Sequence, residues 1–346
     1  MKDGRTTVYN ITDEEKLKRV NPDNIQLEND FLEYLESVDR SKSTIKQYRA
    51  NLHIFWCWNL DFNKNKFFVE LTKRELIKFQ NHALNVWKWS PRRIRVVKAT
   101  ISSLSNFIES ILDDEFEDYR PIIKKIESPA NEAVRTKTVF QDEDLNSLLS
   151  ELVDDKEYMK ACILALAIYS GKRKAELTRF KASYFDDKNL ICEGALYKTP
   201  EKMQTKGRGQ KGKLLDVYTI AKPFKPYLDL WMQERNKLGI DSDWLFPKTK
   251  NGEYINEHIE ISLMDSMART FSNIIGKPFY WHSMRHRFVS MLSEQGIPDD
   301  VIKDITGWSD VSMVSVYKDI DAEDNFDKYF GSEGIKKVEK KDISDL

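Results

Sequence analysis

The sequence predicts a mostly α-helical protein with a small β-sheet or hairpin, arranged in two main domains. Its 346 residues, 40% of them hydrophobic, are enough to form two cores. Apolar residues recur at helical spacing in both halves of the chain. Short apolar runs flank a turn rich in Gly and Lys, TKGRGQKGK, at residues 205–213. The helices therefore dominate, and the strands are confined to the second half.

The N-terminal domain is expected to be a bundle of four helices over residues 25–120, after a flexible polar arm at residues 1–24. The expected starting points are, in order, Ile25, a cap at Ser43 or Thr44, the capping-box pair Thr72 and Glu75, and Ser90-Pro91. Two prolines, a Ser-Pro pair and weak apolar periodicity predict a linker at residues 121–138.

The second domain is expected over residues 139–320, followed by a C-terminal tail at 321–346. It begins with a helix from Asp142, whose acidic opening suits the positive end of a helix dipole. Residues 190–192 and 214–218 are the strands expected beside the Gly-Lys turn. Three short helices are expected at 281–317. Their expected boundary residues are Gly296, Pro298, Gly307 and Ser309.

Composition argues against membrane and metal functions. No apolar run approaches the roughly 20 residues needed to span a bilayer, and no signal-peptide pattern precedes the polar N-terminus. We therefore expect no membrane contact and a cytoplasmic location. Cys57, Cys162 and Cys192 match no metal-binding spacing and fit reduced, buried thiols. No carboxylate cluster suits two-metal nuclease chemistry, so neither a metal nor a cofactor is expected.

Charge is segregated along the chain, although the net charge is only −1. Residues 41–100 hold 13 Lys/Arg against 3 Asp/Glu, and residues 196–225 hold 8 against 2. Acid is concentrated at 109–119, with six carboxylates and no base, and in the tail. Such a chain can present basic surface to a polyanion while it remains nearly neutral overall.

The basic stretches offer candidate contacts to a phosphate backbone. Most lie on the polar side of the fourth helix, and one lies in the Gly-Lys turn. The candidates are Lys42, Arg92, Arg93, Arg95, Lys98 and Arg208. The alternative is a solvated basic face on an ordinary helical bundle, because surface charge is common.

The stretch 281–317 places four chemically active side chains at fixed offsets on the three expected helices. They are His282, Arg285, Trp308 and Tyr317, which supply a cationic pair, an indole donor and a phenol. The alternative for a single tyrosine among fourteen is that it packs in the core. Three partners in register favour a site.

The order H-x-x-R-H, then G-W-S, then Tyr nine residues after the Trp resembles the C-terminal half of the active site of the tyrosine recombinase (phage integrase) family. The four N-terminal helices, with basic faces on the second and fourth, resemble that family's core-binding, SAM-like domain, and residues 139–320 its α+β catalytic domain. The resemblance spans roughly residues 26–317. It implies a nucleophilic Tyr317 and double-stranded DNA as the partner. It also implies a homotetramer on DNA, from a free monomer or dimer.

Residues 170–177, SGKRKAEL, match the family's first box. The match implies that Arg173 is the first catalytic arginine, with Glu176 supporting it. Lys172 and Lys174 depart from the family pattern, in which apolar residues are more usual, and they raise the local positive potential. Without the other boxes, Arg173 and Glu176 would be an i, i+3 surface ion pair.

By position, Lys206 matches the family's hairpin lysine. Lys211 and Lys213 are competitors for that role, because the length of the loop varies. A solvated, charge-rich turn is the alternative.

A common physical need connects these residue types. A phenol that attacks a phosphodiester needs cations to balance charge on the non-bridging oxygens, and Arg173 and Arg285 can provide it. Trp308 can donate to the same oxygens, and His282 can accept the phenol's proton. A lysine ammonium can protonate the leaving 5′-oxygen. The resemblance thus implies DNA cleavage and rejoining through a 3′-phosphotyrosyl intermediate.

Two other classes of function remain open. One is a catalytically silent DNA-binding regulator with the recombinase fold, such as a phage repressor. The other is a type IB topoisomerase, which shares the phosphotyrosine chemistry. The compact four-helix N-terminal domain and the H-x-x-R-H box favour the recombinase.

Overall fold

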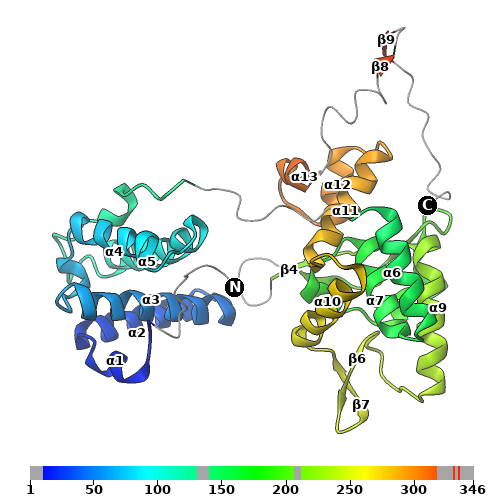
Figure 1. The fold of residues 1–346 in the computed structure, drawn as a ribbon, viewed down its shortest axis with the longest axis horizontal. Coiled ribbons are helices and arrows are strands. Elements are labelled where there is room, and N and C mark those ends of the chain that lie inside the picture. The colour runs from blue at the N-terminus through cyan, green and yellow to red at the C-terminus, as the bar shows by residue number, and fades with distance from the viewer. Residues whose placement is uncertain (1–10, 131–139, 206–211, 318–329, 332–333, 336–346) are drawn as a thin grey trace. The chain divides into compact units, whose positions relative to one another are not determined.

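The computed structural model describes residues 11–130, 140–205, 212–317, 330–331 and 334–335. They form two compact units. The helical unit comprises residues 11–130, and the mixed unit begins at residue 140 (Figure 1).

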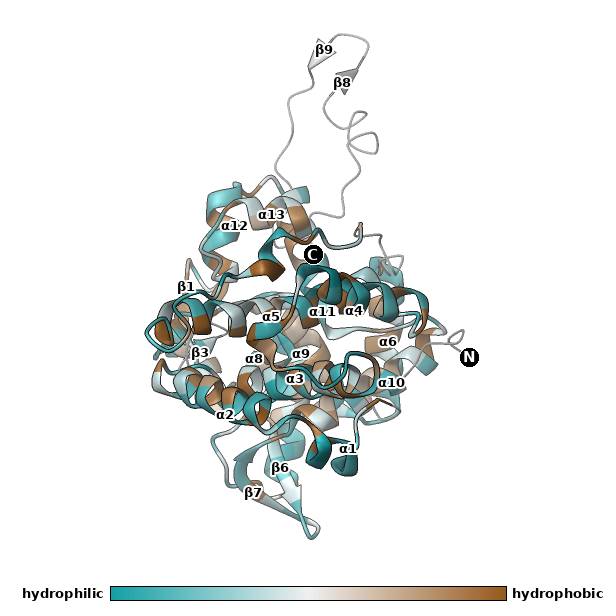
Figure 2. Ribbon diagram, turned by 90° about the vertical axis from the view of Figure 1, so that its left-hand side faces the viewer, coloured by the Kyte–Doolittle hydropathy of each residue, from teal (hydrophilic) through white to brown (hydrophobic). Residues whose placement is uncertain are grey.

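The helical unit contains the four expected helices and a short one before them. These helices are α1 (Glu14–Arg19), α2 (Pro22–Ser37), α3 (Lys42–Phe62), α4 (Lys73–Asn85) and α5 (Pro91–Ile111). Two 3₁₀ turns, Phe68–Glu70 and Ile122–Lys125, complete the unit. Helices such as α2 carry both hydrophilic and hydrophobic segments (Figure 2), and the apolar residues of the unit form one shared core around Phe31, Phe55 and Trp56. An amphipathic face that each helix buries against the others is what makes the bundle stable.

The capping residues explain where these helices begin. The predicted capping box is present, because Thr72 accepts from the backbone of Glu75 and the Glu75 carboxylate accepts from the backbone of Thr72. Ser90 caps α5 with Pro91 at its first turn, as expected. The cap of α3 is Ser41 rather than Ser43 or Thr44, since the Ser41 hydroxyl accepts from the Thr44 backbone.

The expectation of a flexible arm over residues 1–24 is wrong for its described part. Asp13 caps α1, and Asn21 caps α2 ahead of Pro22. Ile11 and Val20 are buried in the core of the unit. The polar residues of this stretch are the exposed side of folded helices, and residues 1–10 lie outside the described part of the chain.

The expected linker at 121–138 also starts too early. Ile123 is buried in the core of the helical unit, and the carbonyls of Ile126, Glu127 and Pro129 accept hydrogen bonds from side chains of α4 and α5. Residues 122–129 therefore belong to the helical unit. Residues 131–139 lie outside the described part.

The mixed unit contains helices α6 to α13 and short strands. The helices are α6 (Asp142–Asp154), α7 (Tyr158–Ser170), α8 (Lys174–Leu177), α9 (Ala221–Lys237), α10 (Ile261–Ile275), α11 (Trp281–Glu294), α12 (Asp299–Thr306) and α13 (Ser312–Tyr317). Two 3₁₀ turns lie at Ala182–Phe185 and Asp187–Asn189. Helix α7 is apolar on nearly all sides and is the buried centre of the unit.

The strands form small antiparallel sheets. They are β1 (Leu190–Ile191), β2 (Leu196–Lys198), β3 (Met203–Thr205), β4 (Lys213–Leu215), β5 (Tyr218–Ile220), β6 (Pro247–Lys250), β7 (Glu253–His258), β8 (Phe330–Gly331) and β9 (Gly334–Ile335). Strand β2 lies between β1 and β5, and β3 pairs with β4, β6 with β7 and β8 with β9. The β6–β7 hairpin projects from the unit (Figure 1).

Strand β3, not residues 190–192, pairs with β4 to flank the Gly-Lys turn, with Thr205 opposite Lys213. The expectation failed because Met203–Thr205 is too short to show strand periodicity. Cys192 corrects a second expectation, since it is exposed while Cys57 and Cys162 are buried. Burial raises the pKa of the Cys57 thiol to about 11. None of the described helices is long and apolar enough to cross a bilayer.

Candidate active site

The turn between α7 and α8 brings Arg173 to the site. Helix α7 ends at Gly171, which has a φ of +59°. A Cβ atom added at Gly171 would lie 2.3 Å from Cδ1 of Phe288 in α11. Glycine is therefore needed both for the turn and for the close approach of α11.

Arg173 and Glu176 are joined at the start of α8. One Glu176 oxygen accepts from the Arg173 backbone at 2.9 Å, and the other accepts from Arg173 Nη1 at 3.0 Å. Glu176 is buried, whereas the Arg173 side chain is partly exposed. A buried carboxylate that holds one guanidinium edge leaves the rest of Arg173 able to meet an anion.

Arg285, on α11, is fully buried, with 0% of its surface exposed. Its Nη1 donates to the Gly171 carbonyl at 2.8 Å, and its Nη2 donates to the Thr306 carbonyl at 3.0 Å. Burial and the neighbouring Arg173 lower the pKa of Arg285 to about 10, so it remains charged at neutral pH. The guanidinium thereby ties the first box to the end of α12.

The turn after α12 positions Trp308. Gly307 ends the helix with a φ of +77°, in agreement with the expected stop. The indole of Trp308 then lies 4.7 Å from the guanidinium carbon of Arg285, in a cation–π contact. Asp310, not the expected Ser309, accepts from the backbone of Ser312 at the start of α13.

Tyr317, at the end of α13, reaches His282 on α11. Their Oη and Nε2 atoms are 2.9 Å apart. Tyr317 is 8% exposed, and its ring centroid lies 6.0 Å from the Arg285 guanidinium carbon. His286 stacks on the Tyr317 ring at 4.3 Å. A role for His286 went unpredicted, although its place one helical turn after His282 was visible in the H-x-x-R-H box.

Two buried N–H donors of this cluster make no hydrogen bond within the described part of the chain. Neither Arg285 Nε nor Trp308 Nε1 has a hydrogen-bond partner among the residues that the structure describes. Buried donors are normally satisfied, so such a pair beside two guanidinium groups suits an anion such as phosphate. The site as a whole combines fixed positive charge, a phenol and an imidazole.

Lys172 and Lys174 differ in a way that the sequence did not indicate. Lys174 is on the surface and pairs with Asp265 at 2.6 Å. Lys172 is only 2% exposed, and its Nζ donates to the Ile305 carbonyl at 2.8 Å. The expectation that both simply raise the local potential is therefore wrong for Lys174, whose charge is paired.

The α5 candidates for DNA contact separate into two groups. Lys98 is 6% exposed, and its Nζ donates to Gln80 Oε1 and to the carbonyls of Ile126 and Glu127. Its prediction as a DNA contact is wrong, because these three acceptors use all three ammonium protons. Arg95 donates to the Pro129 carbonyl at 2.9 Å. Both residues hold the segment after the helical bundle.

The remaining candidates stay compatible with a DNA contact. Arg92 and Lys42 are exposed. Arg93 is half-buried, and its guanidinium lies over the Trp89 ring, 5.1 Å from the centroid. These are the described basic groups on which the prediction for the helical unit still rests.

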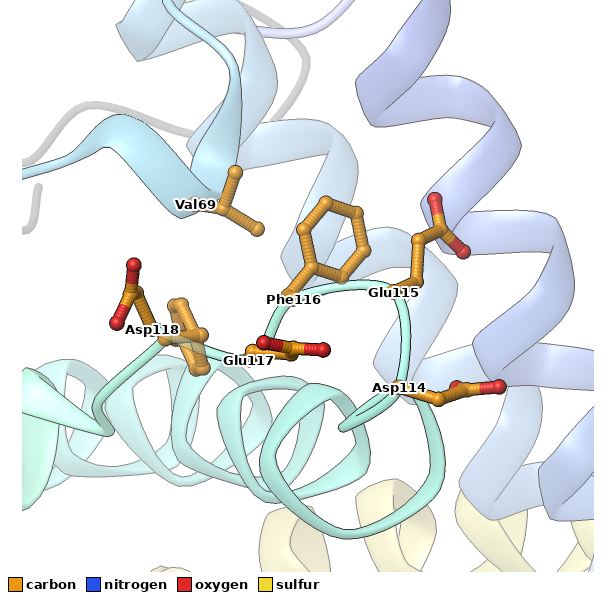
Figure 3. A pocket seen from close by; sticks show the side chains of 7 residues that line it. Val69, Asp114, Glu115, Phe116, Glu117 and Asp118 are labelled. Carbon is orange, nitrogen blue, oxygen red and sulfur yellow. The ribbon is translucent and has the colours of Figure 1, made fainter.

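The acid-rich stretch after α5 forms a shallow hollow in the helical unit (Figure 3). Its lining residues are Val69, Asp114, Glu115, Phe116, Glu117, Asp118 and Tyr119. Four carboxylates at one place would repel a phosphate backbone. A DNA contact of this unit would therefore use another of its faces.

Two predicted residues, Lys206 and Arg208, lie outside the described residues, between β3 and β4. Lys213, a competitor of Lys206, is exposed at the start of β4. Among the described residues, no group of three or more His, Cys, Asp or Glu side chains is placed to hold a metal ion.

Comparison with known proteins identifies the two units. The N-terminal SAM-like domain of phage integrases matches residues 27–118, and the phage integrase family matches residues 138–324. The recombinase-like protein YomM, derived from the SPbeta prophage of Bacillus subtilis, is 28% identical over 266 residues, 76% of this chain and 77% of that protein. Tyrosine recombinase XerD of Listeria innocua is 25% identical over 294 residues, 83% of this chain and 92% of XerD.

Solved structures show the same fold. The XerH site-specific recombinase in a post-cleavage complex with difH DNA superposes with a TM-score of 0.62 at 17% identity, over 82% of this chain and 78% of XerH. A lambda integrase dimer bound to a core site gives a TM-score of 0.60 at 13% identity, over 91% of this chain and 99% of that one. With the family matched over more than half of the chain, this protein belongs to the phage integrase family, the tyrosine-type site-specific DNA recombinases.

Proposed function

We propose that this protein cleaves and rejoins double-stranded DNA at a specific site, with Tyr317 as the nucleophile of a 3′-phosphotyrosyl intermediate. The observation that carries the proposal is the hydrogen bond of 2.9 Å between Tyr317 Oη and His282 Nε2, beside the buried charge of Arg285. A phenol next to a proton acceptor and a fixed cation is an activated nucleophile. A purely structural tyrosine needs neither partner.

The chemistry follows from these contacts. Tyr317 Oη forms a bond to the scissile phosphorus and gives its proton to His282, while the bond to the 5′-oxygen breaks. Arg173 and Arg285 balance the charge that grows on the non-bridging oxygens. Trp308 Nε1, which has no partner among the described residues, donates to the same oxygens. Rejoining reverses the steps with a new 5′-hydroxyl.

The leaving 5′-oxygen needs a proton, for which Lys206 is the proposed donor. Lys206→Ala should cleave ordinary DNA slowly, yet cleave a 5′-bridging phosphorothiolate at nearly the wild-type rate, because sulfur leaves without a proton. Lys213→Ala is the matched variant on the other side of the turn. Rescue of Lys213→Ala instead of Lys206→Ala would assign the role to Lys213.

We also infer how the protein assembles. The lambda integrase structures include a tetramer bound to a Holliday junction, and a tetramer of this chain on two paired DNA sites would match that arrangement. The free protein would be a monomer or dimer, and the tail at 321–346 would dock on a neighbouring protomer. Such a reaction belongs in the cytoplasm of a bacterial or phage-infected cell. Native mass spectrometry of the protein on joined sites would count the protomers.

The test is capture of a covalent adduct from genomic DNA fragments. The wild type, denatured in SDS after incubation, should retain DNA whose sequence reveals the target site. Tyr317→Phe should retain none while it binds that site nearly unchanged, because the lost hydroxyl is not a main phosphate contact. Tyr254→Phe, on the β6–β7 hairpin, is the matched control and should behave as the wild type. Tight, specific binding with no adduct from the wild type would instead identify a silent DNA-binding regulator.

A further inference from the structure

Lys172 is a buried lysine that the proposed chemistry does not use. It lies between Gly171, whose carbonyl binds Arg285, and Arg173. Its Nζ donates at 2.8 Å to the carbonyl of Ile305, in the last turn of α12. Lysine is almost never fully buried unless it is paired, so this position calls for an explanation.

The contacts of Lys172 and Arg285 converge on one helix end. Arg285 binds the carbonyl of Thr306, and Lys172 binds that of Ile305, so two cations hold adjacent carbonyls at the C-terminus of α12. A helix C-terminus carries partial negative charge and favours cations there. The next residues after this turn are Gly307 and Trp308. The position of the Trp308 indole therefore depends on this helix end.

We propose that Lys172 is a positioning residue of the DNA-cleavage reaction, and that its ammonium form ties the α12–Trp308 turn to the turn that carries Arg173. The inference rests on the proposed function for its effect on cleavage. The hydrogen bond from Lys172 to Ile305 does not depend on the proposed function, because it is a property of the folded protein. An apolar side chain, as the family more usually has here, cannot make it.

The charges around Lys172 make the tie sensitive to pH. Burial, then Arg285, lower the pKa of Lys172 to about 7; Glu176 opposes this shift and Arg173 adds to it. These are the charged groups from α8, α11 and the turn between α7 and α8 that act on the lysine. The ammonium form gives the stronger hydrogen bond, because a charged donor binds a carbonyl more tightly. The tie should weaken as the pH rises through about 7.

The stability of the folded protein should increase as the pH rises, whereas the hydrogen bond from Lys172 to Ile305 weakens. An unfolded lysine keeps its ordinary pKa of 10.5, so between about 7 and 10.5 the unfolded chain binds more protons than the folded one. The contribution of Lys172 to stability is therefore poorest below pH 7 and improves as the pH rises toward 10.5. Lys172→Met should accordingly stabilise the fold at pH 6, and the gain should shrink at higher pH. A lysine kept only for stability would give the reverse.

The experiment compares Lys172→Met, Lys172→Gln and the control Lys174→Met. Hydrogen exchange of residues 299–309 at pH 6 should be faster in Lys172→Met than in the wild type, and unchanged in Lys174→Met, whose surface pair lies elsewhere. Gln keeps a neutral N–H donor, so Lys172→Gln should give intermediate exchange. Equal exchange in the wild type and Lys172→Met would overturn the proposal, whether or not the protein cleaves DNA.

Cleavage supplies the second readout. In single turnover at pH 6, Lys172→Met should cleave about tenfold more slowly than the wild type, the effect of one charged hydrogen bond. The wild-type rate relative to Lys172→Gln should decline from pH 6 to pH 8.5, while Lys174→Met follows the wild type. A Lys172→Met enzyme with the wild-type rate and pH profile would refute the role in cleavage. Absence of any wild-type adduct would refute the proposed function alone, because hydrogen exchange of residues 299–309 tests the Lys172–Ile305 hydrogen bond without DNA cleavage.

Discussion

At the scale of single residues, Trp308 packs on Arg285 and also has an indole N–H that is available to donate a hydrogen bond. Its ring covers the Arg285 guanidinium, and its Nε1 is buried without a partner among the described residues. Trp231 offers a contrast, because its Nε1 already donates to the Leu245 carbonyl at 2.8 Å. The N–H of Trp231 is therefore already used in the fold, whereas that of Trp308 can still donate to a ligand.

Trp308→Phe should therefore slow cleavage with little loss of stability. The substitution keeps an aromatic ring on Arg285 and removes the indole N–H, which in our proposal donates to the scissile phosphate. Single-turnover cleavage should therefore fall by about 10²-fold. Trp231→Phe removes the same type of donor from a satisfied bond. It should lower the free energy of unfolding by about 1 kcal/mol and leave cleavage unchanged. A Trp308→Phe enzyme as fast as the wild type would remove the indole N–H from the mechanism.

Single residues also mark the limit of sequence-based prediction. The resemblance of the spaced motifs to the tyrosine recombinase family was enough to propose Arg173, His282, Arg285, Trp308 and Tyr317 as one site. The burial of Lys172 could not be foreseen. It depends on Ile305, which is 133 positions away in the chain.

At the scale of elements, helix α5 carries basic residues in two different environments. Arg92 is exposed at its first turn, whereas Lys98 binds main-chain carbonyls of the segment after the bundle. Helical periodicity showed that both are on the polar side, but not which of them the chain itself would cover. The same limit explains the early start assigned to the linker.

A charge change at each of these two residues tests whether Arg92 contacts DNA and Lys98 does not. Arg92→Glu should weaken DNA binding and reduce the log–log salt slope by about one unit for a lost phosphate contact. Lys98→Met should leave the salt slope unchanged and lower the thermal midpoint, because the Ile126 carbonyl loses its donor and the Glu127 carbonyl keeps only Gln80. Fluorescence anisotropy across salt concentrations measures both. A salt slope that responds to Lys98→Met but not to Arg92→Glu would reverse the assignment.

At the scale of the whole molecule, the division into two units and their helical character could be predicted from apolar periodicity and caps. The ends of the units could not, because α1 is mostly polar and residues 122–129 show weak apolar periodicity, and both pack against a core formed by distant residues. The prediction of the strands beside the Gly-Lys turn was wrong in part, because β3 also depends on a partner elsewhere in the chain. A strand of three residues is defined by its partner rather than by its own sequence.

The whole account depends on one chemical event, the transfer of a DNA phosphate to Tyr317. The most direct measurement is the site and polarity of the adduct formed on the captured target DNA. Peptide mass spectrometry should find the nucleotide on Tyr317, and the released strand should carry a 5′-hydroxyl that a kinase labels without prior dephosphorylation. An adduct on another residue, or a phosphate left on the 5′ end, would contradict the account.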